Sequence, residues 1–149
     1  MPTESQNIEI RAARPADASG IASLCGQLGY PTTEKEAGQR LQAILDQGDD
    51  AVLVATLPEG DIVGWVHVHV CRLLVADPQV TLGGLVVDEG HRGNGIGRRL
   101  MERVEAWAHE RGCGVVVLSS NVVRDEAHRF YEGLGYERTK TSYAFRRTL

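Results

Sequence analysis

The segment HRGNGIGRRL, residues 91–100, constrains the fold most because it places three glycines within five positions. The apolar stretch LGGLVVD precedes it and is typical of a strand, and an amphipathic helix is predicted after it, over residues 95–111. The face that this helix buries is formed by Ile96, Leu100, Met101, Val104 and Ala108. The segment therefore predicts a tight turn from a strand into a helix.

A strand-to-helix turn of this kind can bind an anion. The backbone N–H groups in the first turn of a helix have no intrahelical partners, and the helix dipole is positive there. Glycines remove the Cβ atoms that would keep a phosphate away from the backbone, and Arg92 and Arg98 can neutralise its charge. No Lys-Ser/Thr pair follows the glycines, which excludes a Walker P-loop, and the spacing is not that of a dinucleotide-binding fold. We predict a phosphate or pyrophosphate site.

The rest of the chain predicts one mixed α/β domain over residues 1–149. Asp17 is a predicted N-cap of a first helix, and Thr33 with Glu36 forms a capping box for a second one with Ala37, Leu41, Ile44 and Leu45 on its buried face. A bulge or close backbone approach is predicted at residues 83–84. A short helix is expected over residues 124–133. Strands are expected over residues 8–13, 51–57, 62–74, 80–87 and 115–119 (buried), with a closing hairpin of 136–139 and 142–147.

Composition narrows the function classes. Residues 1–90 carry five Lys/Arg and 13 Asp/Glu, a balance of −8, whereas residues 91–149 carry 11 and seven, a balance of +4. The first part thus suits a cation and the second an anion, while the net charge of −4 argues against nucleic acid. Three widely spaced cysteines, no signal-peptide pattern and no long apolar run predict a cytoplasmic protein without a membrane partner.

Two motifs together carry a family resemblance. RGNGIG, residues 92–97, resembles the R/Q-x-x-G-x-G/A signature of the GNAT superfamily of acetyl-CoA-dependent N-acetyltransferases, and AHRFYEGLGY resembles its A-x-x-F-Y-x-x-x-G-F/Y motif. The resemblance covers essentially the whole chain. It implies the GNAT fold, a single mixed, mostly antiparallel central sheet flanked by about four helices. It also implies acetyl-CoA as cosubstrate, and a homodimer paired through the closing strands.

The resemblance assigns positions for the cosubstrate. Backbone groups of Leu85, Val86 and Val87 would pair with the pantetheine arm, a backbone N–H near Val86 would bind the developing oxyanion, and Asn121 would reach the cosubstrate from the next strand. Tyr131 would lie near the sulfur and protonate the departing thiolate as general acid. The pyrophosphate would be held by backbone N–H groups of Arg92, Gly93, Asn94, Gly95, Ile96, Gly97 and Arg98.

The general base is left open by the sequence. Thr81 stands where histone-acetylating members carry a glutamate, and it cannot act as a base. His67 and His69 share one face of a strand and have the right pKa range, whereas His128 is expected to point away from Tyr131; a relay through water is an equal alternative. The pattern His-x-His-x-Cys over residues 67–71 could supply three zinc ligands, but a fourth ligand is not evident in the sequence, so no metal is predicted.

The predicted activity is acetylation of a primary amine on a small, cationic acceptor by direct attack in a ternary complex. Tyr30, in the segment GQLGYPTTEKE, is expected to face the acceptor together with His67 and His69. The alternatives are acetylation of a protein N-terminus or lysine, and a non-catalytic module that binds coenzyme A as a sensor.

Overall fold

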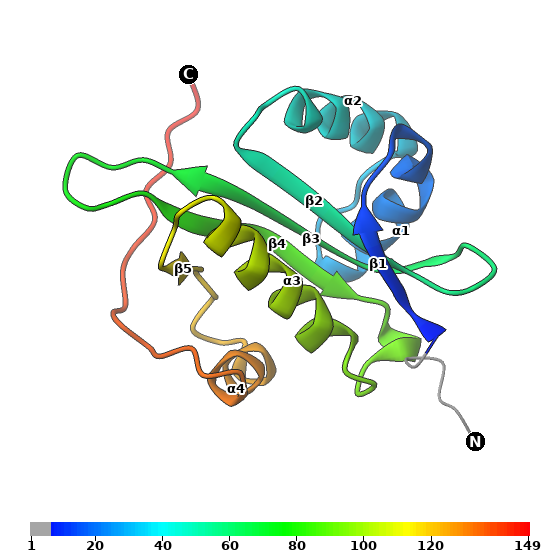
Figure 1. Ribbon diagram of the computed structural model, residues 1–149. Helices are drawn as coiled ribbons and strands as arrows, with labels where there is room; N and C mark the ends of the chain where they lie inside the picture. Colours follow the sequence, from blue (N-terminus) through cyan, green and yellow to red (C-terminus); the bar gives the residue numbers. More distant parts are fainter. Residues whose placement is uncertain (1–6) are drawn as a thin grey trace. The chain divides into compact units, whose positions relative to one another are not determined.

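The computed structural model describes residues 7–149, which divide into two compact units, one ending at Leu118 and the other formed by Ser119–Leu149. In the first unit a five-stranded sheet has the order β1-β2-β3-β4-β5, antiparallel except for the parallel pair β4–β5 (Figure 1). Its strands are β1 (Glu9–Ala12), β2 (Asp50–Thr56), β3 (Ile62–Cys71), β4 (Gln79–Val87) and β5 (Val116–Val117). Its helices are η2 (Pro15–Asp17), α1 (Ala18–Leu28), α2 (Glu34–Leu45), η3 (Glu89–His91) and α3 (Ile96–Glu110). The second unit contains α4 (Asp125–Gly133). The predicted mixed, mostly antiparallel sheet with four α-helices is confirmed.

Each face of the sheet packs against helices. Val66 and Val68 of β3 are fully buried in a core shared with α3, whereas Trp65, on the opposite face of the strand, packs against the core formed with α1 and α2. The predicted stripe of α3 is confirmed, because all five of its apolar residues are buried. The sheet is therefore covered on both faces within the first unit (Figure 1).

A bulge interrupts the pairing of β3 with β4. His67 pairs with Gly84 and Val68 pairs with Leu82, so Gly83 is the extra residue, as the glycine pair predicted. Before the bulge Leu82 packs on the α3 core, and after it Leu85 and Val87 do. Because side chains alternate with a period of two, only the extra residue allows both segments to face the same core.

Of the local predictions for the first two helices, one is confirmed and two differ from the structure. The Thr33–Glu36 capping box is confirmed by reciprocal hydrogen bonds of 3.0 and 3.1 Å. Asp17 occupies the N-cap position of α1 but makes no capping hydrogen bond; its carboxylate accepts from the Arg14 N–H at 2.7 Å and from the Arg11 guanidinium at 2.7 and 2.9 Å. Leu45, expected on the buried face of α2, is its last residue and is 37% exposed.

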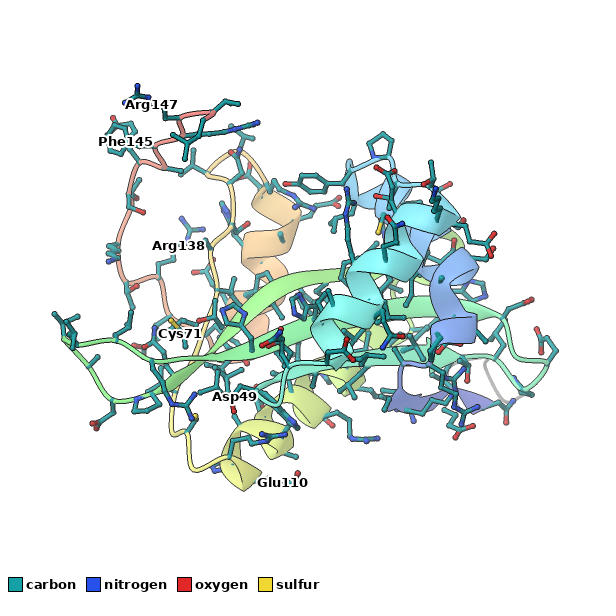
Figure 2. All side chains as sticks on the ribbon, turned by 90° about the horizontal axis from the view of Figure 1, so that it is seen from above. Asp49, Cys71, Glu110, Arg138, Phe145 and Arg147 are labelled. Carbon is teal, nitrogen blue, oxygen red and sulfur yellow. The ribbon has the colours of Figure 1, made fainter. Side chains whose placement is uncertain are left out.

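The two strands expected at the C-terminal end are absent. Within residues 136–149, all of which are described, there is no helix or strand, and Tyr143 and Phe145 are 90% and 94% exposed. Figure 2 shows Phe145 and Arg147 on this irregular segment. The predicted hairpin is wrong because two strands without a packed face are marginal in water. A homodimer was expected to pair through these strands. It stays a prediction, but the strands that were to form its interface are absent.

The last strand of the sheet is also shorter than expected. It contains two residues, Val116–Val117, and Val115 is 54% exposed, so the predicted buried strand over residues 115–119 is wrong in extent and burial. Among residues 7–149 no helix has the length and apolar character that a membrane span requires.

Candidate functional site

The outer edge of β4 is open along its C-terminal half. β5 pairs with β4 only at Val80 and Thr81, so no strand within residues 7–149 lies beyond the part of β4 that follows the bulge. The Asp88 N–H bonds to the Val63 carbonyl of β3 at 2.8 Å, and antiparallel strands alternate the direction of their backbone groups. Val86 therefore directs its backbone toward β3, and a Cβ on Gly64 would lie 3.2 Å from the Val86 carbonyl.

This alternation corrects one expectation. Of the three residues predicted to pair with an extended ligand, only Leu85 and Val87 present N–H and C=O groups to the open edge. Val86 does not, and its side chain is buried, with 4% exposure. A donor to a developing oxyanion on this edge must therefore come from Leu85 or Val87.

The glycine segment forms the turn that its sequence predicts. Gly93 and Gly95 have φ values of 82° and 81°, in the left-handed region, and Gly95 is the N-cap of α3. A Cβ on either would meet nothing within 4 Å, so these positions require glycine for backbone conformation. At the start of α3 the Arg99 N–H donates to the Gly95 carbonyl at 3.0 Å. The N–H groups of residues 96–98 precede it and form the unpaired first turn of the helix.

A carboxylate that the sequence analysis overlooked fixes the start of this turn. Asp88 accepts hydrogen bonds from Gln27 Nε2 at 2.7 Å, from the Gly90 N–H at 3.1 Å and from His91 Nδ1 at 2.7 Å. Gln27 Oε1 in turn accepts from the Glu89 N–H at 2.8 Å. These bonds hold the pKa of the Asp88 carboxyl below its usual range. The bond from Gln27 has the largest effect, and the bond from His91 the next largest. The signal in the sequence is an aspartate directly after a strand; its partner Gln27 is 61 residues away.

Four arginines on the glycine segment and α3 differ in what they contact. Arg92 donates from Nε to the Val87 carbonyl at 3.0 Å, which anchors its exposed guanidinium at the end of β4, and Arg98 is exposed on the first turn of α3. Arg99 and Arg103 instead bond the carbonyls of Ile8 and Ile10 at 2.8 and 3.0 Å and so tie α3 to β1. Arg92 and Arg98 are therefore the cations placed for an anion at the glycine segment.

The residues predicted for the acceptor lie on the α1/α2 face of the sheet or beside α1. His67 Nε2 is 2.9 Å from Asp50 Oδ2, and the His67 and His69 ring centroids are 6.1 Å apart. Tyr30 follows α1 and is 69% exposed. Asp50 was missed by the sequence analysis because its contact with His67 comes from strand pairing. Among the described residues, no group of three or more His, Cys, Asp or Glu is arranged to hold a metal ion.

Two predicted residues lie in the second unit. Asn121 begins the turn into α4: its Oδ1 accepts from the Val123 N–H at 3.1 Å, and its carbonyl oxygen lies 2.9 Å from His128 Nε2. Tyr131 packs edge-on against Phe130, with ring centroids 5.1 Å apart.

The environment of Tyr131 changes its acidity. Burial raises the pKa of the Tyr131 hydroxyl above its ordinary value, and the positive charge of Arg124 opposes this in part. The hydroxyl is therefore protonated throughout the neutral pH range and can donate a proton.

Comparison with known proteins places these features in one family. The profile of the acetyltransferase (GNAT) family matches residues 21–136. The chain is 32% identical over 145 residues to an aminoglycoside N(6')-acetyltransferase type 1 of Stenotrophomonas maltophilia, covering 94% of this chain and 93% of that protein. It is 29% identical to a streptothricin acetyltransferase of Streptomyces lavendulae, covering 90% and 84%.

A solved structure has the same fold. The structure of AAC(6')-Iy in complex with the bisubstrate analogue CoA-S-monomethyl-acetylneamine superposes with a TM-score of 0.83, covering 95% of this chain and 99% of that one, at 20% identity.

Proposed function

Because the chain belongs to the GNAT family of acetyltransferases, we propose that it transfers the acetyl group of acetyl-CoA to a primary amine of a small, cationic acceptor. The chain is an acetyl-CoA-dependent acyltransferase, and it is close in sequence to an aminoglycoside 6'-N-acetyltransferase. The acceptor class, the site residues and the role of Tyr131 are our proposals.

The observation that carries the proposal is the open edge of β4 leading directly to the glycine turn. Leu85 and Val87 would bond the amide groups of the pantetheine arm, as an added strand does at a sheet edge. The pyrophosphate would lie on the backbone of residues 92–98, where Gly93 and Gly95 present no Cβ and α3 directs its N–H groups outward. Arg92 and Arg98 would supply positive charge. The family resemblance also assigns Asn121 to the cosubstrate.

The chemistry follows from what acetyl transfer requires. A neutral amine attacks the thioester carbonyl directly, in a ternary complex, so no acetylated enzyme is formed. A backbone N–H of Leu85 or Val87 would donate to the carbonyl oxygen as negative charge develops there. Tyr131 would donate its proton to the departing sulfur, a role to which a partly buried, protonated hydroxyl is suited.

A cationic acceptor is supported by two observations. The relatives from Stenotrophomonas maltophilia and Streptomyces lavendulae are named for aminoglycoside and streptothricin acetylation. The acidic excess also lies in residues 1–90, which contain the α1/α2 face, although Asp17 and Asp49 are already paired with arginines there. We expect Tyr30 to border the acceptor.

The test is release of coenzyme A from acetyl-CoA across a panel of aminoglycosides, polyamines, lysine-like amines and peptides. We expect the fastest turnover with polycationic small amines, and Tyr131→Phe to lower kcat severalfold or more with little change in acetyl-CoA affinity. Tyr143→Phe is the matched control, because Tyr143 is 90% exposed.

Three results would contradict parts of the proposal. Turnover of peptides alone would make the chain a protein acetyltransferase. Tight acetyl-CoA binding without turnover of any amine would make it a coenzyme A-binding module. Equal kcat for Tyr131→Phe and wild type would remove the proposed acid.

A further inference from the structure

A carboxylate and a histidine form a pair across β2 and β3. Asp50 Oδ2 lies 2.9 Å from His67 Nε2, and the two side chains are 19% and 23% exposed. The pairing is diagonal, because Asp50 lies directly opposite His69 in the strand register. In a neutral imidazole one ring nitrogen carries hydrogen and the other is an acceptor. A carboxylate beside Nε2 therefore holds the hydrogen on Nε2 and leaves the lone pair on Nδ1.

Nδ1 lies over the bulge of β4. A Cβ on Gly83 would lie 2.5 Å from His67 Nδ1 and 3.1 Å from Cε1, so any side chain at position 83 would displace the ring. Gly84 likewise makes room for the Trp65 ring, which a Cβ there would meet at 3.0 Å. Neither glycine has a positive φ. The bulge backbone therefore does not require glycine, and the need is for space under two rings.

The bulge is where the proposed reaction would take place, and this step rests on the proposed function. The pyrophosphate site lies beyond the C-terminal end of β4, so a pantetheine arm bonded to Val87 and Leu85 runs back toward Gly83. The thioester at the end of that arm would reach the bulge beneath His67. The Leu28 side chain, at the end of α1, would lie 3.9 Å from a Cβ on Gly84, so this point adjoins the segment that contains Tyr30.

We propose that His67 is the general base and that Asp50 is the residue that positions it. His67 Nδ1 takes one proton from the ammonium of the acceptor, and the neutral amine then forms the C–N bond as the C–S bond breaks. The sulfur leaves with the electron pair of the C–S bond and takes a proton from Tyr131. The second proton of the amine nitrogen is lost to solvent, and Tyr131 regains its proton from His67 through solvent.

With His67 as the base at the bulge of β4, Thr81 need not supply one. Histidine is the side chain most often used as a general base, because one nitrogen of the neutral imidazole accepts a proton. The described contacts of His67 with titratable groups are those with Asp50 on β2 and His69 on β3, and β4 presents uncharged glycine backbone to it. The carboxylate of Asp50 also stabilises the imidazolium that forms during the transfer.

The test compares the pH dependence of kcat/KM for wild type, His67→Gln and Asp50→Asn, with the best amine of the panel, between pH 5.5 and 9. Removing a general base costs about 10²- to 10⁴-fold in rate, so His67→Gln should lose about 100-fold or more and lose the rise of kcat/KM with pH through the imidazole range. Asp50→Asn should lose about tenfold and move that rise along the pH axis, because the imidazolium loses its carboxylate partner. Acetyl-CoA affinity and melting temperature should be close to those of wild type in both.

Asp49→Asn is the matched control. Asp49 is the neighbouring residue, labelled in Figure 2, and its carboxylate bonds Arg72 at 2.6 Å rather than His67. This variant removes the same charge next to the pair and should keep the wild-type pH profile. Gly83→Ala is an independent variant: it retains both members of the pair but displaces the ring, and it should also slow turnover.

Each result decides between the two proposals. If wild type binds acetyl-CoA but acetylates no amine, the proposed function and the base assignment both fail. If wild type is active and His67→Gln keeps its rate and pH profile, the base assignment alone fails. If His67→Gln is unstable, Asp50→Asn decides, since a wild-type pH profile in that variant would overturn the pair.

Discussion

Gly95 and Gly112 lie at the two ends of α3 and offer a matched pair of substitutions. Their φ values are 81° and 74°, and a Cβ on either would meet nothing within 4 Å. Alanine at either position therefore introduces no clash and carries only the cost of the left-handed backbone, about 1–2 kcal/mol. Only Gly95 belongs to the proposed pyrophosphate site.

The free energy of unfolding should fall by about 1–2 kcal/mol in Gly112→Ala, and in Gly95→Ala by the part of that cost that the unbound turn retains. A loss of about 1–2 kcal/mol corresponds to a fall in melting temperature of about 2–8 °C for a domain of this size. Domains have about 5–15 kcal/mol of stability, so both variants should remain folded. In Gly112→Ala the cost should appear only in stability.

The two variants should differ in acetyl-CoA affinity. If the unbound turn in Gly95→Ala relaxes out of the left-handed region, binding must restore that conformation at a cost of about 1–2 kcal/mol. The dissociation constant would then rise about 5- to 30-fold, and contact between the new methyl group and the pyrophosphate would add to this. Any strain that the unbound turn retains should appear as lost stability instead.

Isothermal titration calorimetry with acetyl-CoA and thermal unfolding of the same samples measure both quantities. We expect Gly112→Ala to bind within about twofold of wild type and Gly95→Ala to bind about 5-fold more weakly or worse. Wild-type affinity in Gly95→Ala together with a wild-type melting temperature would refute the assignment of the pyrophosphate to this turn, because the turn would then have relaxed without any cost to binding.

Two further predictions concern stability. Leu100→Ala, in the core between α3 and the sheet, where Leu100 is fully buried, should lower the free energy of unfolding by about 2–5 kcal/mol in urea titrations. Hydrogen bonding to Arg11, the largest cause, and to the Arg14 N–H lowers the pKa of the Asp17 carboxyl. The stabilisation by Asp17 is therefore fully present above the unfolded carboxyl pKa of about 3.9 and is lost as pH falls through the lower folded value. Asp17→Asn should cost about 1–2 kcal/mol at pH 7, and the difference from wild type should shrink as pH falls through the folded pKa; a difference that stays constant into acid would contradict the assignment.

Features that depend on a few neighbouring residues could be predicted from the sequence. The Thr33–Glu36 capping box, the buried stripe of α3 and the turn at Gly95 are confirmed because hydrogen bonding, helical periodicity and backbone sterics act within one or two turns. The family resemblance is confirmed for the same reason, since its two motifs are contiguous in the chain.

Features that depend on residues far apart in the chain were decided by the tertiary structure. The hairpin expected over residues 136–147 is absent because a strand needs a partner, and alternation of residues does not supply one. The direction of the Val86 backbone follows from the register with β3, and the Asp50–His67 and Gln27–Asp88 contacts join residues 17 and 61 positions apart. The sequence alone thus determined the glycine turn and the family, whereas strand pairing decided which groups face the open edge of β4 and which carboxylate holds His67.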